Sequence, residues 1–178
     1  MNKKELRKLL RKRKLPDDYI REAGQIIAEK VIELPQFQQA CSVFCYLSSD
    51  SEPSTDRILA EAFRNKRVYV PKCIDDHEMK AVRIHSNEGL IINGFGIREP
   101  KNMDETETSF DLMIVPCMAA GTHGERLGHG RGYYDRFLQN AGGNIICLCF
   151  EKNIRNDIEM DEHDISMPCV ITEEKIYE

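Results

Sequence analysis

The chain of 178 residues contains no tryptophan, and aromatic residues make up only 7% of it. It also lacks any apolar run near the roughly 20 residues that a helix needs to cross a bilayer, so we predict no membrane span. The first 14 residues, MNKKELRKLLRKRK, contain no apolar stretch followed by a cleavage site, which argues against a secretory signal. They also carry Glu5 and no serine-rich stretch, which argues against a transit peptide. These absences favour an ordinary globular protein with no membrane partner.

The seven cysteines show no Cys-x-x-Cys spacing and are odd in number. Several stand inside apolar runs, in CSVFCYL at 41–47 and NIICLCF at 144–150, where a free thiol behaves as a small hydrophobic side chain. A disulfide scaffold or a zinc site is therefore not expected. Free cysteines favour a reducing compartment, and we expect a cytoplasmic location.

Charge is distributed unevenly along the chain. The formal net charge is −5, but residues 1–14 hold eight basic residues and one acidic residue, which leaves −12 for the remainder. The acidic balance argues against a dedicated nucleic-acid binder, whereas the basic arm suits a polyanion. From composition alone, the arm is either a polyanion-binding segment or a solvated helix.

Helical and strand-like patterns alternate along the chain. Apolar spacing predicts helices over residues 2–14, with Leu6, Leu9 and Leu10 on one face, and from 17 to Pro35, which ends the second helix. Another helix is predicted after Pro53, placed in its first turn, and one more from about 132 to 140. Strands are predicted at 41–47, 67–71, 79–84, 111–116, 144–150 and 169–172, and residues 101–109 as a surface loop. The fold class is therefore α/β, a single-domain, mostly parallel, doubly wound Rossmann-like sheet with helices on both faces.

The segment PCMAAGTHGERLGHGRGYYDRFL at 116–138 carries five glycines between a strand and a helix. Alternating glycines let backbone N–H groups approach an anion closely, and the helix that follows directs its positive end toward the same place. Arg126 and Arg131 add guanidinium groups that bind phosphate in bidentate fashion. The pattern predicts a phosphate site, although it matches neither the Walker loop nor the dinucleotide fingerprint. The alternative is a flexible turn with solvated arginines.

Residues 126–138 resemble the signature of the 5-formyltetrahydrofolate cyclo-ligase family, also called 5,10-methenyltetrahydrofolate synthetases. The resemblance extends over nearly the whole chain, because five further segments fall in the family's order and spacing: KKELR at 3–7, YLSSDSEPST at 46–55, GFGIREP at 94–100, DLMIVP at 111–116 and EHD at 162–164. It implies one domain over residues 1–178 with a NagB/RpiA/CoA-transferase-like fold. It also implies a monomer that takes 5-formyltetrahydrofolate, with or without a polyglutamate tail, and no nucleic acid or membrane.

The activity implied by the resemblance is the ATP- and Mg²⁺-dependent closure of 5-formyltetrahydrofolate to 5,10-methenyltetrahydrofolate, with release of ADP and phosphate. In the family's mechanism, ATP phosphorylates the formyl oxygen, N10 of the folate attacks the activated carbon, and phosphate leaves. Such chemistry requires positioning and charge neutralisation rather than a nucleophilic side chain.

The resemblance also assigns roles to individual residues. The expected ATP contacts are Lys3, Lys4, Arg7, Arg126, Leu127, Gly128, His129, Gly130, Arg131, Gly132, Tyr133 and Tyr134. The expected folate contacts are Leu47, Glu52, His129, Gly130, Arg131, Gly132 and Tyr133. Arg126, Arg131 and Tyr133 are the expected catalytic residues. Asp135 and Asp164 are the expected Mg²⁺ ligands, because Mg²⁺ prefers hard oxygen ligands.

Each assignment has a simpler alternative. Without the resemblance, the basic helix is a solvated surface, and Asp135 is a first-turn acid favoured by the helix dipole. Asp164 is then a solvated acid, Leu47 a core residue, and Glu52 a residue that helps to start a helix. A metal site at His123, Glu125 and His129 has little support from their spacing.

The chain departs from the family at Ala120-Gly121, where a Phe-Asp pair is usual. This departure keeps a second hypothesis open: a nucleotide or sugar-phosphate-binding paralogue with a different folate substrate or none. A third hypothesis, a nucleic-acid accessory protein that uses residues 1–14, is opposed by the acidic remainder and by the lack of aromatic residues in the arm.

Overall fold

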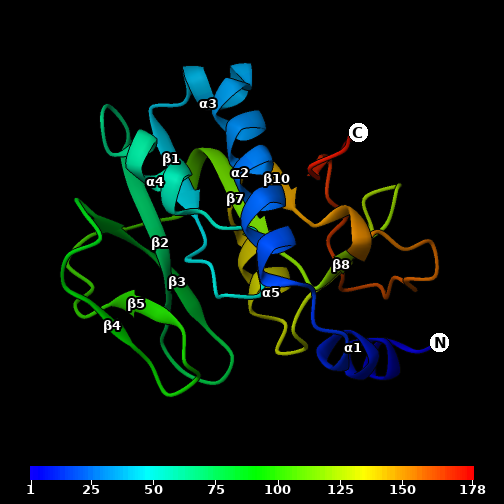
Figure 1. Cartoon of the computed structure of the whole chain (residues 1–178). Coiled ribbons are helices and arrows are strands. Elements are labelled where there is room, and N and C mark those ends of the chain that lie inside the picture. The colour runs from blue at the N-terminus through cyan, green and yellow to red at the C-terminus, as the bar shows by residue number, and fades with distance from the viewer.

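A twisted eight-stranded sheet forms the centre of the computed structural model, which describes residues 1–178 (Figure 1). The strand order is β12-β11-β10-β7-β1-β2-β3-β6. The five strands from β11 to β2 run parallel, and the strands at both edges are antiparallel. The strands of this sheet are β1 (Ser42–Cys45), β2 (Arg67–Cys73), β3 (Met79–Ile84), β6 (Thr106–Glu107), β7 (Ser109–Pro116), β10 (Gly142–Leu148), β11 (Val170–Ile171) and β12 (Ile176–Tyr177). The prediction of a mostly parallel α/β sheet is confirmed.

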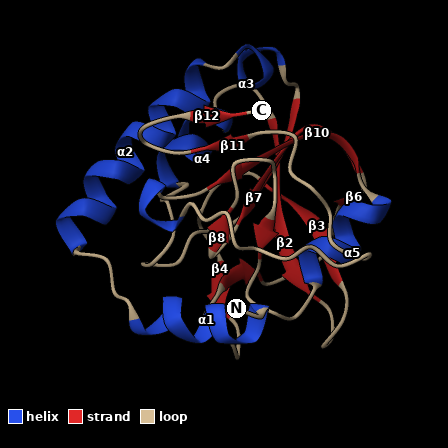
Figure 2. Ribbon diagram, turned by 90° about the vertical axis from the view of Figure 1, so that its right-hand side faces the viewer, coloured by secondary structure: helices blue, strands red, loops and turns tan.

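Helices cover both faces of the sheet, and Figure 2 shows α2 and α5 on opposite sides of it. The helices are α1 (Lys3–Lys12), α2 (Asp17–Glu33), α3 (Pro35–Gln39), α4 (Asp56–Ala62) and α5 (Tyr133–Asn140), with a 3-10 turn at Glu151–Asn153. One apolar core packs α2, α3 and α4 against the sheet, and a second packs α5 against the other face. The alternation of side chains along β1 and β7 divides the two cores, since Val43 faces the first and Phe44 the second.

Helix α1 stands apart from the two layers and has its own small core (Figure 1). It begins with a capping box, in which the Asn2 side chain accepts from the backbone N–H of Glu5 while the Glu5 carboxylate accepts from that of Asn2. Leu6 and Leu10 are buried against Leu127 and its neighbours. The prediction that Leu9 shares this face was wrong, because Leu9 is exposed.

Several boundaries differ from the prediction where a short element lies between the long ones. Pro35 begins the short helix α3 rather than only ending α2, and α4 begins at Asp56, so Pro53 lies outside it. The glycine-rich segment contains a small hairpin of β8 (Ala119–Ala120) and β9 (Arg126–Leu127). A second hairpin consists of β4 (Leu90–Ile92) and β5 (Arg98–Pro100), and GFGIREP forms its turn and β5. The predicted loop at 101–109 includes β6, and β12 follows the last predicted strand. No helix is long and apolar enough to cross a membrane.

The Asp111 carboxylate ties the start of β7 to the start of β1. Its Oδ2 accepts from the backbone N–H groups of Cys41 (2.8 Å) and Ser42 (2.9 Å), and these bonds lower the pKa of Asp111. Because Asp111 is exposed and asparagine keeps an acceptor oxygen, we expect Asp111→Asn to lower the free energy of unfolding by only about 0.5 kcal/mol at neutral pH. A lowered pKa in the folded state means that this stabilisation is present above the unfolded pKa and is lost as pH falls through the folded pKa. Urea unfolding at pH 7 and at pH 2.5 checks this, since the difference between variant and wild type should shrink at the lower pH.

Candidate active site

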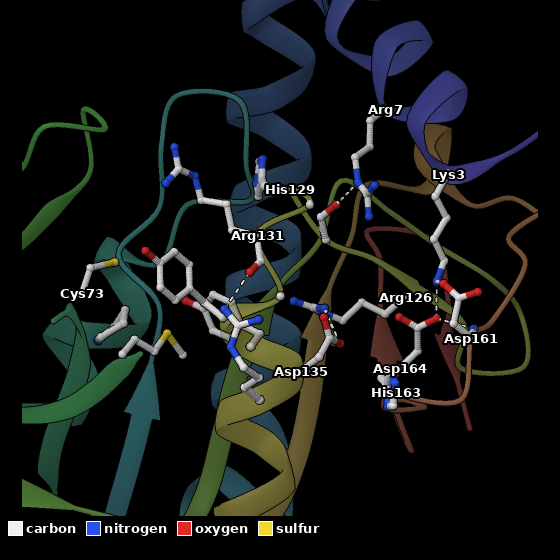
Figure 3. A pocket seen from close by; sticks show the side chains of 18 of the residues that line it. Lys3, Arg7, Cys73, Arg126, His129, Arg131, Asp135, Asp161, His163 and Asp164 are labelled. Carbon is white, nitrogen blue, oxygen red and sulfur yellow. Dashed lines mark hydrogen bonds and ion pairs between the residues drawn. The ribbon is translucent and has the colours of Figure 1, made fainter. Parts of the chain in front are cut away.

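A cavity of about 960 Å³ opens at the carboxyl end of the parallel strands, the usual ligand position in such sheets (Figure 3). Its walls come from α1, the glycine-rich segment with the start of α5, the β4–β5 hairpin, and the segment 159–164. Parts of the chain more than 100 residues apart therefore meet around one space. Nearly all of the residues expected to contact ATP or Mg²⁺ line it: Lys3, Lys4, Arg7, Arg126, Gly128, His129, Gly130, Arg131, Gly132, Tyr133, Tyr134, Asp135 and Asp164. Leu127 is buried behind them in the small α1 core.

The glycine-rich segment requires glycine at two of its turns. Gly130 has φ +102° and Gly132 has φ +69°, which are left-handed conformations that side chains other than glycine rarely adopt. Gly132 precedes the first turn of α5, and its carbonyl accepts from the N–H of Arg136. The first turn of α5 therefore points into the cavity, as expected for an anion site.

Arg126 is almost completely buried and rigidly held. Its Nε donates to the Pro116 carbonyl (3.0 Å), and its Nη1 lies 3.3 Å from Asp135 Oδ1. The guanidinium carbon is 5.3 Å from the centre of the Tyr134 ring, a cation–π contact. These contacts place a fixed positive charge beneath the glycines, beside a carboxylate that lines the same cavity.

Helix α1 is fastened to the glycine-rich segment by arginines. Arg7 Nε donates to the Gly128 carbonyl (2.8 Å), and Arg11 Nη2 donates to the His129 carbonyl (3.1 Å). Arg13 reaches the Lys152 carbonyl (2.6 Å). Residues 8, 9 and 11–14 are exposed, as a solvated basic helix predicts, and Arg11 and Arg13 make these bonds from the surface.

Lys3, at the start of α1, lies between two carboxylates of the segment 159–164. Its Nζ is 2.6 Å from Asp161 Oδ2 and forms an ion pair with Asp164 as well. Burial opposes the charge on Lys3, but the bonds to Asp161 and Asp164 outweigh it and raise the Lys3 pKa. Asp161 was not predicted from the sequence, although the acidic run DEHD at 161–164 contained the signal. Asp135 and Asp164 face one space and offer hard oxygen donors, which fits Mg²⁺ bound by one or two carboxylates together with phosphate oxygens.

Tyr133 and Arg131 have partners of their own. The Tyr133 hydroxyl donates to the Asp75 carbonyl (2.6 Å), and burial raises the pKa of Tyr133, so this phenol is not a proton acceptor near neutral pH. The Arg131 guanidinium lies 3.8 Å from the centre of the Phe95 ring, on the turn between β4 and β5. The sequence reasoning did not find Phe95, although the GFG turn that holds it was part of the family resemblance.

Two expected folate contacts lie behind the cavity wall. Leu47 is buried in the first apolar core and does not line the cavity. Glu52 does not line it either, because its carboxylate accepts from Ser49 N–H (2.9 Å) and lies 3.0 Å from His129 Nε2. Burial alone would raise the pKa of Glu52. The hydrogen bonds from His129 and Ser49 have the larger combined effect, so the pKa of Glu52 is lowered from its ordinary value. Since His129 contacts Glu52, it does not gather with His123 and Glu125 into a metal site, and no group of three His, Cys, Asp or Glu side chains with metal-binding geometry occurs.

The departure at Ala120-Gly121 has a local explanation. Ala120 is completely buried in β8, and neither residue lines the cavity. A Cβ atom at Gly121 would lie 2.0 Å from Glu125 Oε2, so the Glu125 side chain fills the space that a larger residue at position 121 would need. The change alters the packing of the β8–β9 hairpin, and the cavity lining is made by other residues.

Comparisons with known proteins agree over the whole length of the chain. The model of the 5-formyltetrahydrofolate cyclo-ligase family matches residues 1–173. The probable 5-formyltetrahydrofolate cyclo-ligase of Schizosaccharomyces pombe is 32% identical, with 99% of this chain and 97% of that protein aligned, and the 5-formyltetrahydrofolate cyclo-ligase of Escherichia coli K12 is 32% identical, with 94% and 97% aligned. Among solved structures, the 5,10-methenyltetrahydrofolate synthetase of Aquifex aeolicus superposes with a TM-score of 0.86 at 29% identity, covering 99% of this chain and 92% of that one.

Proposed function

Because the chain belongs to the 5-formyltetrahydrofolate cyclo-ligase family, we propose that it is a ligase of one-carbon metabolism that closes 5-formyltetrahydrofolate to 5,10-methenyltetrahydrofolate, driven by ATP and Mg²⁺. The observation that carries the proposal is that α1, the glycine-rich segment and the ion pair between the buried Arg126 and the partly exposed Asp135 meet in one cavity. Its volume of about 960 Å³ lies at the upper end of the range of about 300–1,000 Å³ that ligand pockets commonly span.

The ATP phosphates are proposed to lie on the glycine-rich segment. Backbone N–H groups of 128–132 and the first turn of α5 suit an anion, and Lys3 and Arg7 bring cations from the facing helix. Arg126 supplies a fixed charge from below. Asp135 and Asp164 are the proposed Mg²⁺ ligands, and bound Mg²⁺ would neutralise charge on the transferred phosphoryl group.

The folate is proposed to lie toward the β4–β5 hairpin. There the cavity wall changes from charged to apolar, with Phe95 and Ile97 beside Arg131. Glu52, Leu47 and residues 129–133 remain the proposed folate contacts, and of these only residues 129–133 line the cavity directly. Aromatic and aliphatic side chains suit the flat rings of a folate, whereas the charged half suits the nucleotide.

The chemistry then follows from placement. ATP transfers its γ-phosphoryl group to the formyl oxygen, N10 attacks the formyl carbon and loses its proton, and the carbon–oxygen bond breaks to release phosphate. Arg126 and Arg131 are the proposed charge-stabilising groups for the transfer. Tyr133 is proposed to fix the glycine-rich segment through its bond to Asp75 rather than to exchange a proton.

The alternative of a nucleotide or sugar-phosphate-binding paralogue was motivated by Ala120-Gly121. Since both residues lie outside the cavity lining, the cyclo-ligase assignment is favoured. We further propose a monomer that accepts the folate with or without a polyglutamate tail. The seven free cysteines suit a reducing compartment such as the cytoplasm.

The proposed function is tested by mixing the protein with MgATP and 5-formyltetrahydrofolate and following the ultraviolet absorbance of methenyltetrahydrofolate. We expect absorbance to rise only when ATP, Mg²⁺ and the folate are all present. Stabilisation of the protein by MgATP in thermal unfolding, with no product and no effect of any reduced folate, would instead support the binding paralogue.

Lys3→Met is expected to raise the KM for ATP by about tenfold, because one charge-assisted contact to phosphate is lost while the apolar stem is retained. Lys8→Met is the matched control on the same helix, because Lys8 is exposed and does not line the cavity. Initial rates at varied ATP concentration measure both. Equal KM values for the two variants would contradict a role of Lys3 in ATP binding.

A further inference from the structure

Residues 128–132 of the glycine-rich segment use their backbone carbonyls within the protein, but not their backbone N–H groups. Arg11 Nη2 donates to the His129 carbonyl (3.1 Å). Arg136 Nη2 donates to the Arg131 carbonyl (2.7 Å). None of the N–H groups of 128–132 donates to an acceptor in the protein. The donors of this stretch are therefore free for a ligand, whereas several of its acceptors are already occupied.

The two carbonyl bonds also fix the direction of the N–H groups that follow. Every peptide bond in the chain is trans, and in a planar trans peptide the C=O and the next N–H point in opposite directions. The bond from Arg11 therefore turns the Gly130 N–H away from that arginine. In the same way, the bond from Arg136 turns the Gly132 N–H away from its guanidinium.

Arg136 is itself anchored on the turn between β2 and β3. Its Nε donates to the His77 carbonyl (2.7 Å). This turn is held by Asp75, whose Oδ1 accepts from the backbone N–H groups of His77 and Glu78 at 2.7 Å each. A planar guanidinium thus links a braced turn at the edge of the cavity to the Arg131 carbonyl.

Arg11 reaches the same stretch from α1. It is exposed and does not line the cavity, unlike Arg7 one turn earlier. The helix that carries it is fixed by the burial of Leu6 and Leu10. Arg11 therefore acts on the cavity through the carbonyl that it bonds, and its guanidinium does not face a ligand there.

We propose that Arg11 and Arg136 are positioning residues for the phosphates of ATP, which act through the backbone N–H groups that they orient. By bonding the preceding carbonyls, they keep the N–H groups of Gly130 and Gly132 directed toward the bound anion. The inference rests on the proposed function, since it names what prepares the phosphate site of that cavity. Backbone N–H groups gathered in this way form an anion-binding concavity, and donors that are fixed in advance lose less free energy on binding than donors that must turn.

Amide NMR tests the two assignments residue by residue. In the wild-type protein, MgATP is expected to shift the amide proton resonances of Gly130 and Gly132 downfield, because each N–H gains a charged acceptor. Arg136→Met should remove most of the shift at Gly132 and keep the shift at Gly130, and Arg11→Met should do the reverse. Inorganic tripolyphosphate, which lacks the nucleoside, should give the same pattern. The dispersion of the same spectra reports whether each variant is folded.

Calorimetric titration with MgATP supplies the affinities. We expect R136M to weaken binding by about tenfold and R11M by about threefold, because Arg11 is exposed and makes a single bond. Arg11→Lys retains one N–H donor and should restore the affinity to within about twofold of wild type. Lys8→Met is the matched control, since it removes one positive charge from the same helix at an exposed position outside the cavity. Its affinity and amide shifts should be those of the wild type.

The outcomes separate orientation from the other roles of an arginine. Equal loss of both amide shifts in R136M and in R11M would make the two residues general supports of the loop, and would overturn the inference. Wild-type amide shifts with lowered affinity would mean direct contact with phosphate, and would overturn it too. In both cases the wild-type protein still binds MgATP and forms methenyltetrahydrofolate, whereas a wild-type protein that does neither would overturn the proposed function together with this inference.

Discussion

Arg126→Ala is expected to lower kcat/KM for ring closure by about a thousandfold or more, because it removes a preorganised charge from a dry site. The guanidinium is almost completely buried and is held by the Pro116 carbonyl and Asp135. Its loss also leaves the partly buried carboxylate of Asp135 without its cation. Steady-state rates at saturating ATP, together with far-ultraviolet circular dichroism, measure the effect and check the fold.

Arg126→Lys separates charge from geometry, in case the alanine variant does not fold. Lysine keeps the positive charge but cannot bond Pro116 and Asp135 at once from a planar group, so we expect a folded protein with kcat/KM reduced by about a hundredfold. Arg155→Ala is the matched control, because Arg155 pairs with Asp157 outside the cavity. A folded R126A protein with nearly wild-type activity would contradict the assignment of Arg126.

The second large effect is expected at Gly124, whose substitution by alanine should lower the free energy of unfolding by about 3 kcal/mol or more. Gly124 has φ +87°, and a Cβ atom there would lie 2.3 Å from the Met167 carbonyl oxygen. The Gly124 carbonyl also accepts from the Met167 N–H (2.8 Å). Because this close approach fixes the segment that follows Asp164, G124A should weaken MgATP binding as well as the fold.

Gly94→Ala is the control for Gly124, since a Cβ atom at Gly94 has no neighbour within 4 Å and the residue has no left-handed φ. Chemical unfolding of both variants gives the stability difference, and thermal shifts with MgATP give the binding difference. If G124A were as stable as G94A, the contact between Gly124 and Met167 would not have the strength that we assign to it.

The two central strands could be predicted from the sequence because their carboxyl halves are buried on both faces. DLMIVP and NIICLCF are continuous apolar runs, and both lie in the centre of the sheet as β7 and β10. Elements of two or three residues, such as β6, β8 and β12, depend on partners distant in the chain, and no local pattern identifies them. Leu9 illustrates the same limit, because α1 packs through a narrow stripe centred on Leu6 and Leu10.

The glycine-rich segment and its arginines could also be predicted, since their chemistry is local and the resemblance covers them. What could not be predicted is which side chains oppose them. Phe95 on Arg131, Asp161 on Lys3 and Glu52 on His129 are contacts between loops whose relative placement is set by the sheet. Leu47 remains a proposed folate contact, and what the motif could not indicate is that its side chain is buried in the first apolar core.

The central claim, that ATP activates the formyl oxygen for ring closure in this cavity, is tested most directly by isotope transfer. 5-Formyltetrahydrofolate labelled with ¹⁸O in the formyl group is converted with MgATP, and the released phosphate is analysed by mass spectrometry. The account predicts one ¹⁸O atom in phosphate for each methenyltetrahydrofolate formed, because the formyl oxygen leaves with the phosphoryl group. Formation of methenyltetrahydrofolate with unlabelled phosphate would contradict it.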